Sequence, residues 1–226
     1  MMPNKQEVIP LLLKMDAGGT PFPVHAAVIW DGEEATLVDT GIPGQHELIR
    51  SALEEQGIPF ERVTRILITH QDRDHIGSLP ELVSGGDRIE VLCHEVCKPY
   101  LEGKAPLIKS GMLATPVSVT RTFQDGDTLP IAGGLRVVYT PGHTPDHTSF
   151  YHEPSRTLIS GDALTAQDGN LMPFNPSFTP NKEEAVRSIE KLLDFDIDTV
   201  ITYHGGVCSG NIRERLMEIV RTTPRE

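Results

Sequence analysis

Hydrophobic positions along the chain form short runs rich in β-branched residues, and these runs fall into two successive groups. Runs of this kind, bounded by glycine or proline, are typical of β-strands. The first group predicts strands at residues 8–14, 24–30, 35–39, 63–69 and 89–93. The second group predicts strands at residues 117–123, 135–139, 149–152, 157–160 and 199–203.

Two segments carry their apolar residues at helical spacing instead. The first, residues 45–56, has apolar residues three and four apart and stops at Gly57, a common residue at the end of a helix. The second, residues 181–194, repeats this spacing and follows Pro180. Strands followed by a helix, twice over, predict an α/β fold in which two sheets pack face to face with helices outside.

Length and composition narrow the class of protein. The chain has 226 residues, 38% of them hydrophobic, and no long apolar stretch, so we predict one domain over residues 1–226 with a sizeable core. Residues 1–14 lack the pattern of a secretion signal, which favours the cytoplasm. The three cysteines, Cys93, Cys97 and Cys208, cannot all pair with one another and fit a reducing compartment.

The charge distribution indicates the kind of partner. The net charge is −12, and no basic stripe interrupts the acidic residues. Affinity for nucleic acid depends largely on clustered lysine and arginine, so we expect no nucleic-acid partner. Without a long apolar stretch we expect no membrane partner either. A small neutral or singly charged molecule is the expected substrate, and the pattern leaves the oligomeric state open.

The densest group of metal-ligating side chains follows the predicted strand at residues 63–69. His70, Asp72, Asp74 and His75 lie in one short run. If the extended conformation continues, residues 70, 72 and 74 point to one side, and a turn brings His75 round to join them. Carboxylates held so close together need a cation to neutralise them. The run therefore predicts a metal site, and the alternative is a solvated polar loop.

Three later segments each place one more ligand-type residue after an apolar or β-branched run. These residues are His143, Asp162 and His204. A rigid sheet presents ligands in this way, on the loops at its edge. With the first run they make seven candidate ligands, a number that suits two metal ions better than one.

With these residues in this order, the sequence resembles the metallo-β-lactamase superfamily over residues 24–206. The family pattern is an Asp at a strand end, then His-x-His-x-Asp-His, a His, a bridging Asp and a final His. Asp39 and the residues above occupy these positions here. The resemblance implies a four-layer αββα sandwich with two divalent metal ions.

The resemblance also implies which residues share a metal. One ion is surrounded by His70, Asp72 and His143, and the other by Asp74, His75 and His204, with Asp162 bridging the two ions. Asp39 is implied to fix a turn or to orient a ligand rather than to bind metal.

One residue departs from the family pattern, because Asp72 stands where the second histidine is expected. A carboxylate is a harder ligand than an imidazole and adds negative charge, which shifts the preference of that position from zinc towards iron or manganese. Zinc is the favoured metal for the centre as a whole, with iron or manganese as alternatives. Asp72 could instead pair with Arg73 or reach the metal through water.

The resemblance implies a metal-dependent hydrolase, similar to glyoxalase II-like and lactonase-like members, whose bridging hydroxide attacks a small acyl substrate such as a thioester or lactone. Asp74 is expected to orient the hydroxide. His147 is expected to donate a proton or to orient a ligand, and the alternative is that it closes its turn by hydrogen bonding.

Other functions remain open. Asp72 favours an iron-dependent oxidoreductase of the persulfide dioxygenase or flavodiiron type, and a non-catalytic metal-binding domain is a third possibility. We do not expect β-lactam hydrolysis as the physiological role, because the second histidine is missing.

Two segments are candidates for contacting a substrate. Residues 94–113 could form a lid whose lysines, Lys109 among them, meet a carboxylate, although a solvated helix face is the favoured interpretation. Residues 166–180 are predicted to form a long loop. Its apolar residues, including Phe174 and Phe178, either line a substrate pocket or form a small core of their own.

Overall fold

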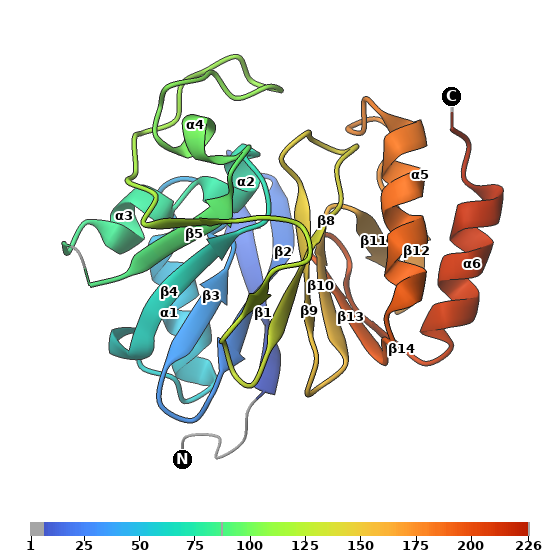
Figure 1. The fold of residues 1–226 in the computed structure, drawn as a ribbon. Coiled ribbons are helices and arrows are strands. Elements are labelled where there is room, and N and C mark those ends of the chain that lie inside the picture. Colours follow the sequence, from blue (N-terminus) through green and yellow to red (C-terminus); the bar gives the residue numbers. More distant parts are fainter. Residues whose placement is uncertain (1–6, 87, 226) are drawn as a thin grey trace.

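Two six-stranded sheets pack face to face, and helices cover both outer surfaces (Figure 1). The structure is a computed structural model that describes residues 7–86 and 88–225. This arrangement confirms the predicted four-layer αββα sandwich.

The first sheet contains its strands in chain order. They are β1 (Glu7–Asp16), β2 (Pro21–Trp30), β3 (Ala35–Val38), β4 (Val63–Ile68), β5 (Glu90–His94) and β6 (Arg121–Phe123). β1 to β3 pair antiparallel, whereas β3 to β6 pair parallel. The helical segments of this half are α1 (His46–Glu55), η1 (Phe60–Arg62), α2 (Arg73–Ile76), α3 (Leu79–Val83) and α4 (Lys98–Leu101).

The second sheet has the strand order β14-β13-β10-β9-β8-β7. Its strands are β7 (Thr128–Leu129), β8 (Leu135–Tyr139), β9 (Thr148–His152), β10 (Thr157–Gly161), β13 (Thr199–Thr202) and β14 (Gly206–Ser209). A separate hairpin joins β11 (Leu164–Gln167) to β12 (Asn170–Pro173). The outer layer consists of α5 (Lys182–Lys191), η2 (Leu192–Asp194), which continues directly from α5, and α6 (Ile212–Thr222). α5 and α6 stand side by side in Figure 1.

Three apolar layers hold the sheets and helices together, and the last three residues of β4 show how one strand contributes to two of them. Ile66 and Ile68 pack in the layer between the first sheet and its helices, whereas Leu67 packs between the two sheets. Successive side chains of a strand point to opposite faces, so a strand buried on both faces needs apolar residues at every position. The C-terminal end of β4 is therefore rigidly placed.

Two of the predicted elements differ from the structure. The strand predicted at residues 117–123 is wrong for its first half, because only Arg121–Phe123 join the sheet as β6. Before them, the amide of Val117 donates to the carbonyl of Leu101, and the amide of Val91 donates to the hydroxyl of Thr120. These non-ladder hydrogen bonds hold the segment against the first half of the molecule without a regular register.

The long loop predicted at residues 166–180 is the second correction, because its first part belongs to the β11–β12 hairpin. Phe174, just after this hairpin, is buried in the core beneath α5 and α6. The helix α6 had not been predicted, although Ile212, Leu216 and Ile219 are buried at helical spacing along it. None of the described helices is long and apolar enough to cross a bilayer.

The turn between β8 and β9 supplies a stability test. Gly142, with φ +132°, lies so close to α5 that an added Cβ would overlap the backbone of Ala185. Gly134 has nearly the same φ, +135°, but its added Cβ would meet only the flexible end of Glu153. The two substitutions G142A and G134A therefore face a similar unfavourable φ. We expect G142A to lower the free energy of unfolding by about 1–3 kcal/mol more than G134A in urea denaturation, because packed backbone does not yield. Equal losses would contradict this packing.

Candidate metal centre

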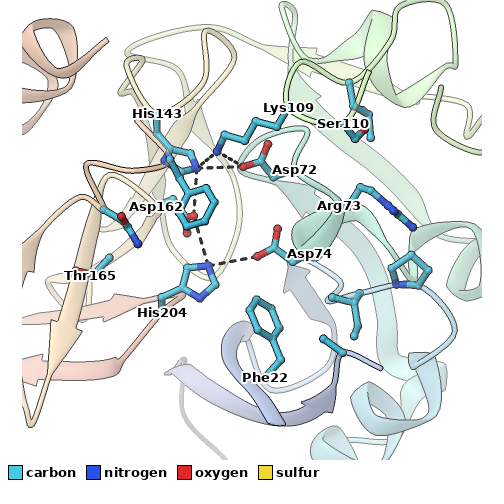
Figure 2. A pocket seen from close by; sticks show the side chains of 16 residues that line it. Phe22, Asp72, Arg73, Asp74, Lys109, Ser110, His143, Asp162, Thr165 and His204 are labelled. Carbon is cyan, nitrogen blue, oxygen red and sulfur yellow. Dashed lines mark hydrogen bonds and ion pairs between the residues drawn. The ribbon is translucent and has the colours of Figure 1, made fainter. Parts of the chain in front are cut away.

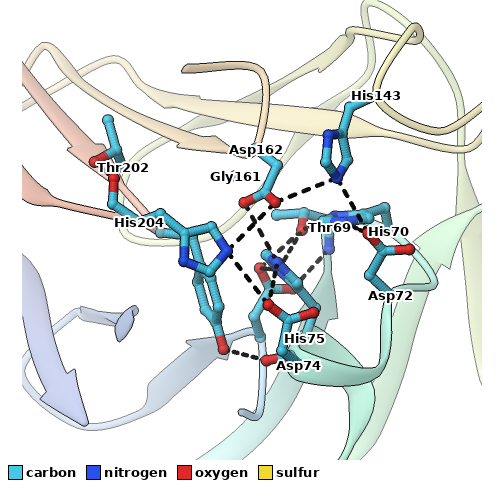
Figure 3. A network of polar contacts seen from close by, with 12 residues as sticks. Thr69, His70, Asp72, Asp74, His75, His143, Gly161, Asp162, Thr202 and His204 are labelled. Carbon is cyan, nitrogen blue, oxygen red and sulfur yellow. Dashed lines mark hydrogen bonds and ion pairs between the residues drawn. The ribbon is translucent and has the colours of Figure 1, made fainter. Parts of the chain in front are cut away.

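The predicted ligands converge from four separate strand ends of the two sheets (Figure 3). His70 follows β4 of the first sheet, and His143 follows β8 of the second. Asp162 comes directly after β10, and His204 comes two residues after β13. Residues far apart in the sequence therefore meet at one edge of the sandwich. The geometry divides the seven predicted ligands into the two groups that could each hold an ion.

The run from residue 70 to residue 75 differs from the predicted conformation, because it does not stay extended. β4 ends at Ile68, and Arg73–Ile76 form the helical turn α2. Asp72 precedes this turn, and its carbonyl accepts hydrogen bonds from the amides of His75 and Ile76. The helical turn, rather than strand alternation, separates Asp72 from its neighbour Asp74 and sends their carboxylates to different groups.

The first group consists of His70, Asp72, His143 and Asp162. Oδ2 of Asp72 lies 3.2 Å from Nε2 of His70 and 3.1 Å from Nε2 of His143. The same nitrogen of His143 lies 3.2 Å from Oδ2 of Asp162. Asp72 thus points directly at the other predicted ligands.

The second group consists of Asp74, His75 and His204. Nε2 of His204 lies 3.3 Å from Oδ2 of Asp74 and 3.5 Å from Oδ2 of Asp162. Nε2 of His75 lies 3.4 Å from Oδ1 of Asp162. Asp162 therefore faces both groups, which is the position that a bridging carboxylate requires.

The chemistry and spacing of these atoms fit divalent metal ions. A tetrahedral ion with bonds of about 2.0–2.1 Å separates its ligand atoms by about 3.3 Å, close to the spacings in both groups. Nε2 of His70, Nε2 of His75 and Oδ1 of Asp162 are buried without a hydrogen-bond partner. Buried polar atoms normally have a partner, so these orphaned atoms are explained by a bound cation.

Comparison with known proteins decides the family. The family model described as the metallo-beta-lactamase superfamily matches residues 19–204. The chain belongs to this superfamily. The resemblance inferred from Asp39 and the later motif residues is confirmed at the level of the superfamily.

Curated relatives in the superfamily are moderately similar. The uncharacterized protein YobT of Bacillus subtilis (strain 168) is 32% identical over 204 residues, covering 81% of this chain and 84% of that protein. The probable metallo-hydrolase YflN of the same organism is 29% identical over 213 residues, covering 81% of this chain and 80% of that protein. An atrochrysone carboxyl ACP thioesterase of Pseudocercospora fijiensis (strain CIRAD86) is 25% identical over 181 residues, covering 79% of this chain but 46% of that protein.

A solved structure shares the fold. The crystal structure of a metallo-beta-lactamase family protein from Thermus thermophilus matches with a TM-score of 0.71 and 24% identity. The match covers 95% of this chain and 78% of that one. This likeness concerns the fold, whereas the ligand geometry described above belongs to this chain.

Buried contacts orient His75 of the second group. Oδ2 of Asp39 lies 2.8 Å from Nδ1 of His75, and both carboxylate oxygens of Asp39 accept hydrogen bonds from Thr69. Asp39 has a left-handed backbone with φ +63°. The ring of Tyr203 packs on that of His75, with centroids 3.8 Å apart, and its hydroxyl donates to the carbonyl of Asp74. Such outer partners set the tautomer and direction of a ligand.

Three of these supporting residues had not been predicted from the sequence. Thr69 also contacts Nδ1 of His70 at 3.0 Å, and Thr179 contacts Nδ1 of His143 at 3.2 Å. Tyr203 is the third. Thr69 directly precedes the predicted ligand His70, and Tyr203 directly precedes His204. Their positions in the sequence could therefore have indicated a supporting role. No sequence signal connects Thr179 to His143, because the two are far apart along the chain.

His147 is completely buried behind the first group. Its Nε2 accepts a hydrogen bond of 2.9 Å from the amide of Asp162, and its Nδ1 lies 2.9 Å from the hydroxyl of Thr140. Burial lowers the pKa of His147 well below its ordinary value, and the nearby His70 and His143 lower it further. Because both ring nitrogens are engaged, this geometry favours an orienting role over proton donation.

The electrostatics of the two groups differ. Burial disfavours the charged form of His204, but hydrogen bonds to Asp162 and Asp74 outweigh burial and raise its pKa to about 9. The pKa of His75 is likewise raised, against burial, by Asp162, Asp39 and Asp74. In the first group, burial lowers the pKa of His143 despite its hydrogen bond to Asp72. Protons therefore compete with a metal mainly at the second group.

A cavity of about 750 Å³ opens onto both groups (Figure 2). Its polar lining includes Asp72, Asp74, His143, Asp162 and His204. Its apolar lining includes Phe22, Ile42, Pro43, Leu107 and Phe178. The combination of apolar walls with a few convergent polar groups is typical of a small-molecule site.

Both candidate substrate segments reach this cavity in part. In residues 94–113, Lys104 pairs with Glu102 at the surface, as the solvated interpretation requires, whereas Lys109 turns into the cavity and contacts Asp72. In residues 166–180, Phe174 is buried in the core, but Phe178 is 59% exposed and lines the cavity. Lys109 and Phe178 thus reach the cavity, whereas Phe174 belongs to the core beneath α5 and α6 rather than to a small core of the loop's own. Contact of either segment with a substrate stays a prediction.

The raised histidine pKa values predict that metal binding releases protons. A metal ligand must be a neutral imidazole, so an ion binding near pH 7 has to displace the protons of His75 and His204. We expect release of about one to two protons per chain and an affinity that increases with pH towards about 9, measured by calorimetry in buffers of different ionisation enthalpy. H204Q should release fewer protons, and H46Q, outside both groups, should match the wild type. Binding independent of pH between 6 and 9 would contradict this assignment.

Proposed function

We propose that the protein is a metal-dependent hydrolase with a dinuclear centre that cleaves a small acyl substrate, such as a thioester or lactone. The observation that carries this proposal is the position of Asp162. Its carboxylate faces both groups of ligands and lines a cavity that also has apolar walls. Relatives named as probable metallo-hydrolases support the class of reaction.

The residues of this chain divide the work of hydrolysis between them. Two divalent ions, when bound, supply a hydroxide at neutral pH and polarise the substrate carbonyl. His70, Asp72 and His143 hold the first position, and His75, His204 and Asp74 hold the second. Asp162 fixes the two positions relative to each other, while His147 fixes the backbone of Asp162 through its amide.

Asp74 is suited to a second task, which is to orient the attacking water. Its carboxylate lines the cavity beside His204. Its carbonyl is held by the hydroxyl of Tyr203, which anchors the helical turn α2. An acceptor fixed in this way can receive a proton from the nucleophile and aim its lone pair at the substrate.

The walls of the cavity support the acyl class of substrate. Phe22, Leu107 and Phe178 offer apolar contact to an acyl group, while the ligand groups in the same cavity are placed to act on its carbonyl. The thioesterase relative, although matched over less than half of its length, is named for cleaving an acyl thioester. The glyoxalase II-like and lactonase-like branches both fit this chemistry.

An iron-dependent oxidoreductase is the second candidate, and the position of Asp72 favours it. Oδ2 of Asp72 points at His70 and His143 at ligand spacing, so a hard carboxylate enters the first group directly. This donor set accepts iron or manganese as well as zinc. Iron in the purified protein, together with oxygen consumption, would place this candidate ahead of the hydrolase.

Removing the shared carboxylate should disable both positions. We expect D162A to lose at least one metal equivalent in elemental analysis and to reduce kcat/KM on acyl thioesters and lactones by about 10³-fold or more, because the metals supply the nucleophile. D198A removes an exposed carboxylate paired with Arg156 and serves as the control. Full metal content and turnover in D162A would exclude a bridging role.

Exchanging the unusual ligand should change metal preference. D72H replaces a hard oxygen donor by imidazole nitrogen, so we expect the zinc-to-iron ratio of protein grown with both metals to increase. Elemental analysis measures this ratio, and D198A again provides the control. An unchanged ratio would mean that residue 72 does not bind metal directly.

A further inference from the structure

Lys109 is the one lysine that contacts the predicted ligands within residues 7–86 and 88–225. Its ammonium group donates to Oδ2 of Asp72 and lies 2.6 Å from Nε2 of His143 (Figure 2). These are the atoms through which Asp72 and His143 would bind the first metal ion. The positive charge of Lys109 therefore lies against two candidate metal-ligand atoms of the first group.

The segment that carries Lys109 is attached to the metal-binding run itself. The amide of Ile108 donates a 2.6 Å hydrogen bond to Oε1 of Gln71, the residue between His70 and Asp72. The side-chain amide of Gln71 in turn donates to the buried carboxylate of Asp146. This attachment holds the ammonium near Asp72 at a high effective concentration.

The second group differs from the first in this respect. In the described part of the chain, no lysine or arginine pairs with Asp74, His75 or His204. Arg73 lines the cavity as well, yet the ion pairs of Asp72 are with Lys109 and histidines rather than with Arg73. The two groups share Asp162 but not the ammonium.

We propose that Lys109 is a tethered cation that competes with a metal ion for Asp72 and His143 and thereby lowers the affinity of the first position. One carboxylate oxygen and one imidazole nitrogen cannot serve an ammonium group and a divalent ion together, because the two cations repel each other at such short range. This inference rests on the proposed dinuclear centre and describes how its occupancy is regulated.

The cavity offers the ammonium group of Lys109 another contact when it leaves Asp72 and His143. The ring of Phe178 lies with its centroid 6.0 Å from the ammonium nitrogen, within the range of a cation–π contact. Lys109 has a long flexible stem and its side chain is about one-third exposed. Loading of the first position therefore requires movement of one side chain and leaves the hydrogen bond from Ile108 to Gln71 intact.

Metal titration of matched variants tests the competition. Chelator-treated protein is titrated with Co²⁺ alone, and calorimetry and visible absorption follow each binding step. The wild type should bind two ions. K109M should tighten one of the two binding steps, the one at the first position, by about tenfold or more, since a charge-assisted contact no longer has to be broken. K109R keeps the charge and should resemble the wild type, as should K104M, whose ammonium pairs with Glu102 at the surface.

Second-site variants assign the affected step to a position. With H204A, which removes a ligand of the second group, K109M should still tighten binding at the first position. With H143A, which removes a partner of Lys109 and a ligand of the first group, the effect of K109M should become smaller, because interacting residues are not additive. Circular dichroism and thermal unfolding verify that each variant is folded.

Several outcomes count against the competition. Unchanged affinities of both steps in K109M overturn it, and so does equal tightening in K109M and K109R, which would indicate side-chain shape rather than charge. Wild-type protein that binds no Co²⁺ would overturn the proposed function together with this inference. Two ions bound by the Lys109 variants with wild-type affinities, and normal hydrolysis, would overturn the inference while leaving the proposed function standing.

Discussion

The arrangement of the site depends on three carboxylates, Asp72, Asp74 and Asp162, which converge on one small volume at the edge of the sandwich. Carboxylates so close together repel one another, and their burial removes the water that would screen them. Asp162 is the most constrained of the three, because it faces histidines of both groups. Cations must balance these charges, and the surrounding residues are placed so that several kinds of cation can do so.

The scaffold makes this convergence possible because each sheet packs against an apolar layer on both of its faces. β4 contributes alternate side chains to two different apolar layers, so its end cannot shift without disturbing both. The turn before His143 is packed against α5 at Gly142, and the turn after β10 is held by the hydrogen bond from Asp162 to His147. The free energy of the apolar layers thus keeps like charges together.

The sequence predicted the sandwich and the identity of the candidate ligands, because both depend on local patterns. Burial on both faces of a sheet leaves apolar runs such as Ile66–Ile68 of β4, and ligand-type residues stand out where such runs end. Less predictable were features set by distant contacts. The helical turn α2 stands in place of the expected extended conformation, because its amides donate to the carbonyl of Asp72. The sequence of residues 94–113 did not indicate which lysine reaches the site.

Charge balance explains why the two halves of the site differ. In the second group the carboxylates raise the pKa of His75 and His204, so protons on these rings supply positive charge. In the first group the pKa of His143 is lowered, and Lys109 provides the positive charge beside Asp72 instead. A proton leaves to solvent when a metal arrives, whereas a lysine stays attached to the chain. The first position therefore keeps its competitor within reach after loading, and this asymmetry follows from the side chain at residue 109.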